Sequence, residues 1–255
     1  MRTSLLFYIL PFFTMKQFHS FHNNNMLSIP KRDFATKIYM RIKKSSSLGG
    51  GGIDGRNMSP LYKPKTANQE LYVKYLNEPS IPIVLGLGPA GSGKTLFACI
   101  QAVMALKSGV VDKIIMTRPV VTVEEDIGFL PGNLIHKMDP WTRPIFDIML
   151  EYYTQKDIDS MLHGGVFEIS PLAYMRGRTF KNAFIIADEM QNSSPNQMLM
   201  MTTRIGDNSK MVITGDLKQS DRGKDNGLLD FMTKMRTYEN YCVRNNFSLP
   251  NIRLV

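Results

Sequence analysis

The sequence predicts an α/β fold in which a parallel β-sheet is covered by helices on both faces. Short, continuous apolar runs recur along the chain and are typical of strands that are buried on both faces. Helix-like segments separate these runs, and a glycine-rich loop joins one of the runs directly to a helix. Strands that alternate with helices need right-handed crossovers, so ligands are expected at the carboxyl ends of parallel strands.

Length and charge indicate one folded domain with an appendage. The 255 residues, 43% of them hydrophobic, are enough for one α/β core of ordinary size. The formal net charge of +9 is unevenly placed, because residues 1–52 contain eight Lys or Arg and one acid. The remainder contains 23 Lys or Arg and 21 Asp or Glu. The charge of the domain itself therefore gives little support to a polynucleotide partner, without excluding one.

The N-terminal segment is predicted to be a disordered basic leader over residues 1–55, followed by a single domain over 56–255. Residues 45–52 are rich in Ser and Gly, which is typical of a flexible linker. The apolar run at 5–10 is too short to span a bilayer, so no stable membrane insertion is expected.

The expected location is intracellular and soluble, with the cytoplasm favoured. Cys99 and Cys242 lack metal-ligand spacing and are typical of small buried residues in a reducing compartment. The basic, hydroxylated stretch at 31–41 resembles an organellar transit peptide. A mitochondrial or other organellar matrix, reached through residues 1–47, therefore stays open as the alternative.

The first half of the domain is expected to contain two helices and two strands. Apolar residues fall at helical spacing around residues 69–76. A strand over 81–87 leads into the glycine-rich loop, and a helix over 96–106 follows it. The next buried strand is expected over 113–119.

A long polar insert separates this half from the remaining strands. A helix is expected from Thr142 to Gln155, then a short strand over 166–170 and a basic loop at 174–178. Two further buried strands, 183–187 and 210–214, each lead into acidic residues.

One more helix is expected between these two strands. Ser193 or Ser194 can cap a helix that Pro195 opens and that closes near Gly206. Both acidic strand ends would then face the same crevice as the glycine-rich loop.

The glycine-rich loop has the full pattern of a phosphate-binding loop. Its residues are Gly88, Pro89, Ala90, Gly91, Ser92, Gly93, Lys94 and Thr95. The glycines let backbone N–H groups surround a phosphate chain, and the following helix directs its positive end at the same anion. Lys94 is expected to reach the β- and γ-phosphates, and the Thr95 hydroxyl to ligate Mg²⁺. The sequence therefore predicts a nucleoside triphosphate site.

The acidic pair after strand 183–187 points to hydrolysis. Asp188 can hold Mg²⁺ through its water shell, opposite Thr95. Glu189 can polarise the water that attacks the γ-phosphate, which a small-molecule kinase would not require. A GTPase would need a guanine-reading Asn-Lys-x-Asp segment, and the sequence contains none.

Several motifs resemble known ATPases. Asp188-Glu189-Met190-Gln191 and the segment 215–219 are similar to the second and third motifs of superfamily 1 helicases. A closer resemblance, from about Thr66 to about Leu229, is to the PhoH-like family of ATPases. The motifs that carry it are the phosphate loop, 117–120, 125–132, 171–179, Asp188-Glu189, 203–206 and 214–216.

The resemblance implies a RecA-like core and further site residues. The strand that ends at Asp216 would lie between the phosphate-loop strand and the Asp188 strand. Gln219 would sense the γ-phosphate and join Lys94 and Glu189 as a catalytic residue. Gln69, with Thr66 and Tyr72 near it, matches the segment that reads adenine, and its amide can pair with the adenine edge.

The resemblance also implies partners. ATP and Mg²⁺ are the expected cofactors, and ATP-driven work on single-stranded RNA is the expected task. A single RecA-like domain needs a neighbour to complete a motor, so a homo-oligomer with ATP at its interfaces is expected. An ATP-dependent binding or assembly protein with slow or absent hydrolysis is the alternative.

Four arginines lie in family motifs and are candidates for an arginine finger or for contacts with RNA phosphates. They are Arg118, Arg176, Arg178 and Arg204. Residues 220–224 depart from the family pattern, which has a short Pro-containing turn there. Residues 251–255 are expected to form only the beginning of a last strand that the family continues with Asp and Arg.

Overall fold

The structure is a computed structural model that describes residues 62–119, 139–245 and 248–255. The predicted leader, the domain boundary near residue 56 and the motif at 125–132 lie outside the described residues. The helices and strands below all belong to the predicted domain.

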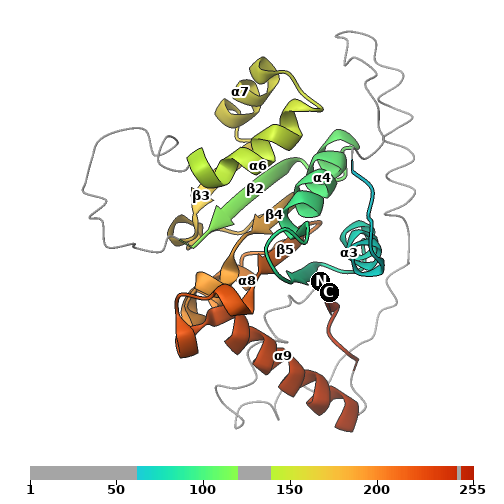
Figure 1. Ribbon diagram of the computed structural model, residues 1–255, viewed down its shortest axis with the longest axis vertical. Coiled ribbons are helices and arrows are strands. Elements are labelled where there is room, and N and C mark those ends of the chain that lie inside the picture. The colour runs from blue at the N-terminus through green and yellow to red at the C-terminus, as the bar shows by residue number, and fades with distance from the viewer. Residues whose placement is uncertain (1–61, 120–138, 246–247) are drawn as a thin grey trace, which may run out of the picture. The chain divides into compact units, whose positions relative to one another are not determined.

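A six-stranded parallel sheet forms the centre of the domain, in the order β3-β2-β4-β5-β1-β6 (Figure 1). The strands are β1 (Ile83–Leu87), β2 (Lys113–Arg118), β3 (Phe167–Pro171), β4 (Ala183–Ala187), β5 (Lys210–Gly215) and β6 (Ile252–Leu254). β5, which leads into Asp216, lies between β1 and β4, as the resemblance implied. The expected RecA-like α/β fold is therefore confirmed, and residues 252–254 form the expected beginning of a last strand.

The register aligns two rows of apolar side chains on opposite faces of the sheet. One row is Val84, Val212, Ile186 and Met116, and the other is Ile83, Met211, Ile185 and Ile115. All eight side chains have no exposed surface. The inner strands are thus buried on both faces, which explains why their sequences are nearly continuous runs of apolar residues.

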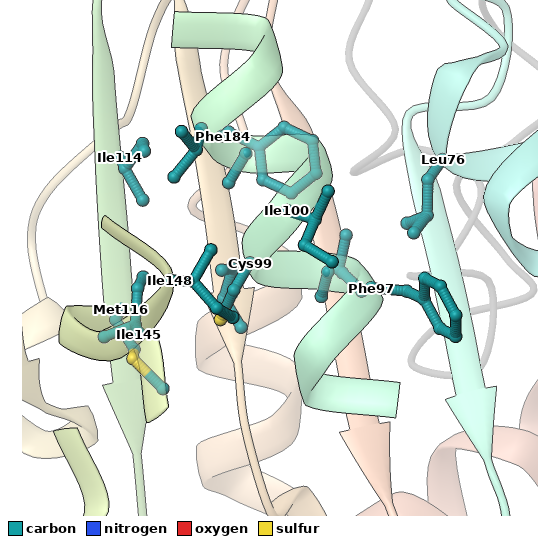
Figure 2. Close-up of a cluster of buried hydrophobic side chains, with 14 of the residues drawn as sticks. Leu76, Phe97, Cys99, Ile100, Ile114, Met116, Ile145, Ile148 and Phe184 are labelled. Atoms are coloured by element: carbon teal, nitrogen blue, oxygen red, sulfur yellow. The ribbon is translucent and has the colours of Figure 1, made fainter. Parts of the chain in front are cut away.

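Four helices belong to the first face of the sheet. They are α3 (Ala67–Asn77), α4 (Lys94–Lys107), α6 (Asp139–Leu150) and α7 (Gln155–His163). α4 packs against β2, β4 and β5 and lies between α3 and α6 (Figure 1). Figure 2 shows the core that results, in which α4, α3 and α6 cover β2 and β4. Its labelled side chains are Leu76, Phe97, Cys99, Ile100, Ile114, Met116, Ile145, Ile148 and Phe184.

The second face is covered mainly by α8 (Pro195–Thr202) and α9 (Gly227–Arg244), which pack against each other. Leu85 of β1 lines a small pocket with Met232 and Met235 of α9 and Ile252 of β6. The short connecting turns are η2 (Leu172–Met175), η3 (Met190–Asn192), η4 (Leu217–Gln219) and η5 (Gly223–Asp225). The sheet is therefore covered on both faces, as predicted.

Some helix boundaries differ from the sequence prediction. A helix was expected from Thr142 to Gln155, and the structure has one, α6, which begins at Asp139 and ends earlier, at Leu150. A separate helix, α7, which was not predicted, begins at Gln155. Thr154 starts this new helix with a capping box: its hydroxyl accepts from the N–H of Asp157, and the Asp157 carboxylate accepts from the N–H of Thr154.

The helix after β4 is shorter than expected. Ser194 caps α8, and the helix ends at Thr202 because Ile205 leaves it to form a bridge with Phe180. The 18-residue helix α9 was not predicted at all; Asn226 caps its start by accepting from the N–H of Leu229.

Both cysteines are buried and free. Within the ranges that the structure covers, no helix has the length and apolar character needed to cross a membrane.

Candidate functional site

The phosphate loop connects the carboxyl end of β1 to the start of α4. Gly91 and Gly93 have φ angles of 77° and 87°, which side-chain-bearing residues rarely adopt. A Cβ atom at Gly93 would also lie 3.0 Å from the Phe97 ring. The first N–H groups of α4 have no acceptor inside the helix and carry the positive end of its dipole. The loop is therefore built to receive an anion.

Lys94 points back across this loop. Its ammonium donates to the carbonyls of Gly88 and Pro89 at 2.7 and 2.8 Å, and to Ser92 Oγ at 3.4 Å. None of these partners carries a negative charge. Within the described residues, Lys94 thus donates to neutral oxygens of its own loop and forms no ion pair with a carboxylate.

Asp188 joins the phosphate loop to the sheet. Its Oδ1 accepts from the Thr95 hydroxyl at 2.7 Å and from the Thr214 hydroxyl on β5. Its backbone N–H donates to the carbonyl of Thr117 on β2 at 2.9 Å. The side chain is only 4% exposed. The structure therefore brings together the two residues that were predicted to bind the metal.

Glu189 follows Asp188 and has an unusual backbone conformation, with φ 52° and ψ 42°. A non-glycine residue in this left-handed region costs about 1–2 kcal/mol, and such residues concentrate at functional sites. Its carboxylate accepts a hydrogen bond from Gln191 Nε2, whereas Gln191 Oε1 accepts from the N–H of Asp216 at 3.1 Å. Sequence analysis did not propose Gln191 as a site residue.

Gln69 holds α3 against the phosphate loop. Its Nε2 donates to the carbonyl of Ser92 at 3.1 Å, and its Oε1 accepts from the N–H of Lys65 at 2.8 Å. Thr66 caps α3 by accepting from the N–H of Gln69, and the Tyr72 hydroxyl donates to the carbonyl of Lys94. Among the contacts of the described residues, the amide keeps one donor and one acceptor position unused, which is what pairing with an adenine edge requires.

Burial also affects the Tyr72 hydroxyl. Loss of water around this buried phenol raises its pKa well above the usual value, so it stays a donor even at strongly alkaline pH.

Gln219 ends η4, directly beyond β5. Its backbone N–H donates to the carbonyl of Asp216 at 3.0 Å, and its side chain is exposed. The Asp216 carboxylate is buried and accepts from the N–H of Lys218. Gln219 therefore lies on the segment that follows β5, the neighbour of both β1 and β4.

The four candidate arginines fall into two classes. Arg178 makes a bidentate ion pair with Glu168 and lies over the Phe180 ring at 4.7 Å. Arg204 donates to the carbonyls of Met200 and Arg178 and to the Thr203 hydroxyl.

The other two arginines lack such partners. Arg118 is half-buried at the carboxyl end of β2, and Arg176 is exposed. Their guanidinium groups make no hydrogen bond or ion pair with any residue that the structure describes. These two guanidinium groups are therefore the ones available to an external anion.

The family comparison agrees with this geometry. Residues 62–248 match the model of a family described as PhoH-like protein. The chain belongs to the PhoH-like family. This is a family of phosphate-loop NTPases, and the matched range includes the phosphate loop, Asp188 and Gln219.

Curated relatives in the PhoH-like family come from distant bacteria. A PhoH-like protein of Bacillus subtilis is 47% identical over 166 residues, which cover 64% of this chain and 51% of the relative. A PhoH-like protein of Mycobacterium tuberculosis is 48% identical over 159 residues, which cover 62% of this chain and 45% of the relative. Protein PhoH of Escherichia coli is 39% identical over 195 residues, which cover 74% of this chain and 54% of the relative. The chain spans about half the length of these relatives.

Proposed function

We propose that this protein binds ATP with Mg²⁺ and hydrolyses it in the crevice at the carboxyl ends of β1, β4 and β5. The observation that carries the proposal is the 2.7 Å hydrogen bond between Thr95 of the phosphate loop and Asp188 of the β4 end. It joins the phosphate-binding element to the acidic strand end at one point. In a phosphate-loop enzyme, that point is where the metal and the γ-phosphate meet.

The phosphate loop supplies the binding energy for the triphosphate. Its backbone N–H groups and the α4 dipole attract the phosphate oxygens. The Lys94 ammonium now donates to the carbonyls of Gly88 and Pro89, and can exchange these neutral acceptors for charged phosphate oxygens. The exchange adds the Coulomb attraction between the ammonium and the phosphate charges, so it favours the bound nucleotide.

The donor set at Asp188 fits Mg²⁺. Thr95 and Asp188 would hold the ion through a hydroxyl and a carboxylate, the hard oxygen ligands that Mg²⁺ prefers. Among the described residues, no group of three or more His, Cys, Asp or Glu side chains is placed to hold a metal. Such a sparse site suits an ion that takes its other ligands from phosphates and water, and that neutralises charge on the phosphate chain.

Glu189 is the proposed general base. Support comes from its position directly after Asp188 and from its left-handed backbone, a conformation that concentrates at functional sites. In this role its carboxylate would accept a proton from the attacking water. Gln219 is the proposed γ-phosphate sensor, because it is exposed and follows the strand between β1 and β4. Gln69 is the proposed adenine reader through its unused donor and acceptor.

The coupling partner is proposed to be single-stranded RNA. Support comes from Arg118 and Arg176, whose guanidinium groups are free to contact phosphates or to act as an arginine finger on a neighbouring subunit. A homo-oligomer would supply the second face of each nucleotide site. We also propose an intracellular site of action, with the cytoplasm first and an organellar matrix as the alternative.

Phosphate release from ATP·Mg²⁺ by the full-length chain tests the proposal, with and without single-stranded RNA. Glu189→Gln is the control, because it keeps the size of the side chain and removes the base. The expected result is release that RNA increases and that falls about 100-fold or more in Glu189→Gln. Equal release by both proteins would overturn the role of Glu189. ATP binding without release would instead favour an ATP-dependent binding or assembly protein.

Light scattering tests the oligomer. Protein at micromolar concentration with ATP·Mg²⁺ is expected to form a species larger than the monomer. A monomer under these conditions would remove the shared nucleotide site from the proposal.

A further inference from the structure

Gln191 lies between the carboxyl ends of β4 and β5, and the hydrogen bonds of the described residues do not join its side chain to the phosphate loop or to Asp188. It belongs to η3, two residues after Glu189, and its side chain is only 1% exposed. Nε2 donates to the Glu189 carboxylate, and Oε1 accepts from the N–H of Asp216 at 3.1 Å. A single buried amide thus bridges the end of β4 and the end of β5.

The chemistry of the two partners determines the orientation of this amide. A carboxylate can only accept hydrogen bonds, and a backbone N–H can only donate. Only the orientation with Nε2 toward Glu189 and Oε1 toward Asp216 satisfies both contacts. The reversed amide would place Oε1 against the Glu189 carboxylate and Nε2 against the Asp216 N–H. Neither contact is a hydrogen bond, and unpaired buried polar groups destabilise the fold.

The surroundings hold Gln191 in this place. The backbone carbonyl of Gln191 accepts a hydrogen bond from the Ser220 hydroxyl at 2.9 Å. A Cβ atom at Gly215 would lie 2.9 Å from Gln191 Oε1 and 2.5 Å from Leu228 Cδ2, so the glycine leaves the room that the amide occupies. The Asp216 N–H and the room left by Gly215 therefore place the Gln191 side chain, and Ser220 holds its backbone.

We infer that Gln191 is a positioning residue that holds the Glu189 carboxylate for proton transfer and ties it to the segment that contains Gln219. The inference rests on the hydrolysis proposed above and deepens it. Glu189 is half-buried, and Gln191 is the only side chain that the described structure shows donating to its carboxylate. The accepting oxygen of a general base must lie within about 2.6–3.2 Å of the atom that carries the proton, so loss of this donor lets the carboxylate leave the required position.

Gln191 also connects the proposed base, Glu189, to the proposed sensor, Gln219. The N–H of Asp216 binds Gln191, the carbonyl of Asp216 accepts from the N–H of Gln219, and Ser220 binds Gln191 again. The turn that contains Gln219 is thus attached to Gln191 on both sides. A movement of this turn on nucleotide binding would therefore also move the donor of Glu189.

The variant Gln191→Glu, made in the full-length chain, removes one hydrogen bond of this side chain and keeps the other. The new carboxylate keeps an acceptor for the Asp216 N–H but cannot donate to Glu189 when ionised. The control is the same change at a different glutamine, Gln197→Glu. Gln197 is half-buried, and in the described structure its Oε1 accepts from the N–H of Ser194 in the α8 capping box, a role that a glutamate carboxylate can also fill.

The expected result is a fall of about 10- to 100-fold in kcat for Gln191→Glu, with KM and the affinity for ATP·Mg²⁺ within about threefold of wild type. Gln197→Glu should keep both constants. In the Glu189→Gln background, adding Gln191→Glu should cause no further loss, because Gln191 acts through the Glu189 carboxylate.

Three outcomes would overturn the inference. The first is an unchanged kcat in Gln191→Glu, and the second is a parallel loss of kcat and ATP affinity, which indicates a structural role. The third is a further loss in the Glu189→Gln background. If the wild type binds ATP but releases no phosphate, the proposed hydrolysis itself fails, and this inference fails with it.

A second variant covers the case in which Gln191→Glu does not fold. Gln191→Asn keeps an amide but is one methylene shorter, so it cannot span both partners. The same criteria apply to it: a lower kcat at constant KM supports the inference, and an unchanged kcat overturns it.

Discussion

The Thr95 hydroxyl donates to the Asp188 carboxylate at 2.7 Å, although the two residues are 93 positions apart in the chain. Asp188 reaches the phosphate loop across β5, the strand between β4 and β1, and the Thr214 hydroxyl of β5 donates to the same oxygen. Two threonines therefore share one carboxylate oxygen. Only one of them, Thr95, belongs to the nucleotide-binding loop.

This difference predicts distinct effects of removing each hydroxyl. Thr95→Val should lower the affinity for ATP·Mg²⁺ by about 10-fold or more, because a metal ligand is lost. Thr214→Val should mainly lower the free energy of unfolding, by about 1–2 kcal/mol, because a buried hydrogen bond to a charged group is lost. Nucleotide titration with and without Mg²⁺, together with urea unfolding, measures both effects. Equal loss of affinity in the two variants would contradict this assignment.

The arginines provide a second prediction. Arg178→Ala and Arg204→Ala should lower Tm by several degrees, because each removes contacts that hold β3 and α8 to the rest of the fold. Arg118→Ala and Arg176→Ala should leave Tm within about 1–2 °C of wild type and lower RNA-stimulated phosphate release. Thermal unfolding and phosphate release on the same four proteins separate the two classes. If only Arg178→Ala or Arg204→Ala loses RNA stimulation, at constant Tm, then these arginines contact RNA and Arg118 and Arg176 do not.

The sheet could be predicted from sequence because its inner strands are buried on both faces. Runs such as 183–187 have no polar position to break the pattern. Strands β4 and β5 lead into an acid, and β1 leads into the phosphate loop. The order of β1, β5 and β4 came from the family resemblance. Strand spacing alone does not determine which strands become neighbours.

The helices that sequence analysis missed had weaker signals. α9 begins with Gly227, a poor helix former, and its apolar positions Leu228, Phe231, Met232 and Met235 stand among polar residues. Their spacing of three and four residues was the signal that could have found it. For α7, the Thr154–Asp157 capping box was the available signal.

Gln191 could not be found from sequence as a positioning residue. Its role depends on the left-handed backbone of Glu189, on the room left by Gly215 and on the N–H of Asp216, which is 25 residues away. No local pattern specifies that a polar side chain two residues after an acid turns inward. Tertiary structure alone brings these groups together.

The Glu168–Arg178 ion pair predicts how stability depends on pH. Hydrogen bonding from Arg178 lowers the pKa of Glu168 below its usual 4.5. The folded protein therefore binds fewer protons than the unfolded chain near this pH, so the stabilisation is complete above about pH 4.5 and is lost as the pH falls through the lowered pKa. Glu168→Gln should be less stable than wild type by about 1 kcal/mol at pH 7, and this difference should vanish in acid.

Urea unfolding at a series of pH values from about 7 to 3 measures this difference. Glu151→Gln is the control, because Glu151 is exposed and forms no ion pair with any described residue. It should follow the wild-type curve. A stability difference for Glu168→Gln that stays constant down to pH 3 would show that the ion pair is not its cause.

The contact between Gly86 and Tyr72 predicts a coupled packing effect beside the phosphate loop. A Cβ atom at Gly86 would lie 2.8–2.9 Å from the Tyr72 hydroxyl and ring, closer than real Cβ contacts allow. Tyr72 is only 4% exposed and also donates to the carbonyl of Lys94, so it has little room to move. Gly86→Ala should therefore lower the free energy of unfolding by about 1–3 kcal/mol through overpacking.

A double-mutant cycle with Tyr72→Leu distinguishes this clash from a general cost of alanine in β1. Leucine removes the ring that meets the new methyl group, so Gly86→Ala should cost at least about 1 kcal/mol less in the Tyr72→Leu background than in wild type. Tyr72→Phe is the matched control, because it removes only the hydroxyl and leaves the ring carbons at 2.9 Å. Phenylalanine should therefore give much less relief than leucine. If Gly86→Ala costs the same in all three backgrounds, the ring is not what requires glycine, and α3 is not held to β1 by this contact.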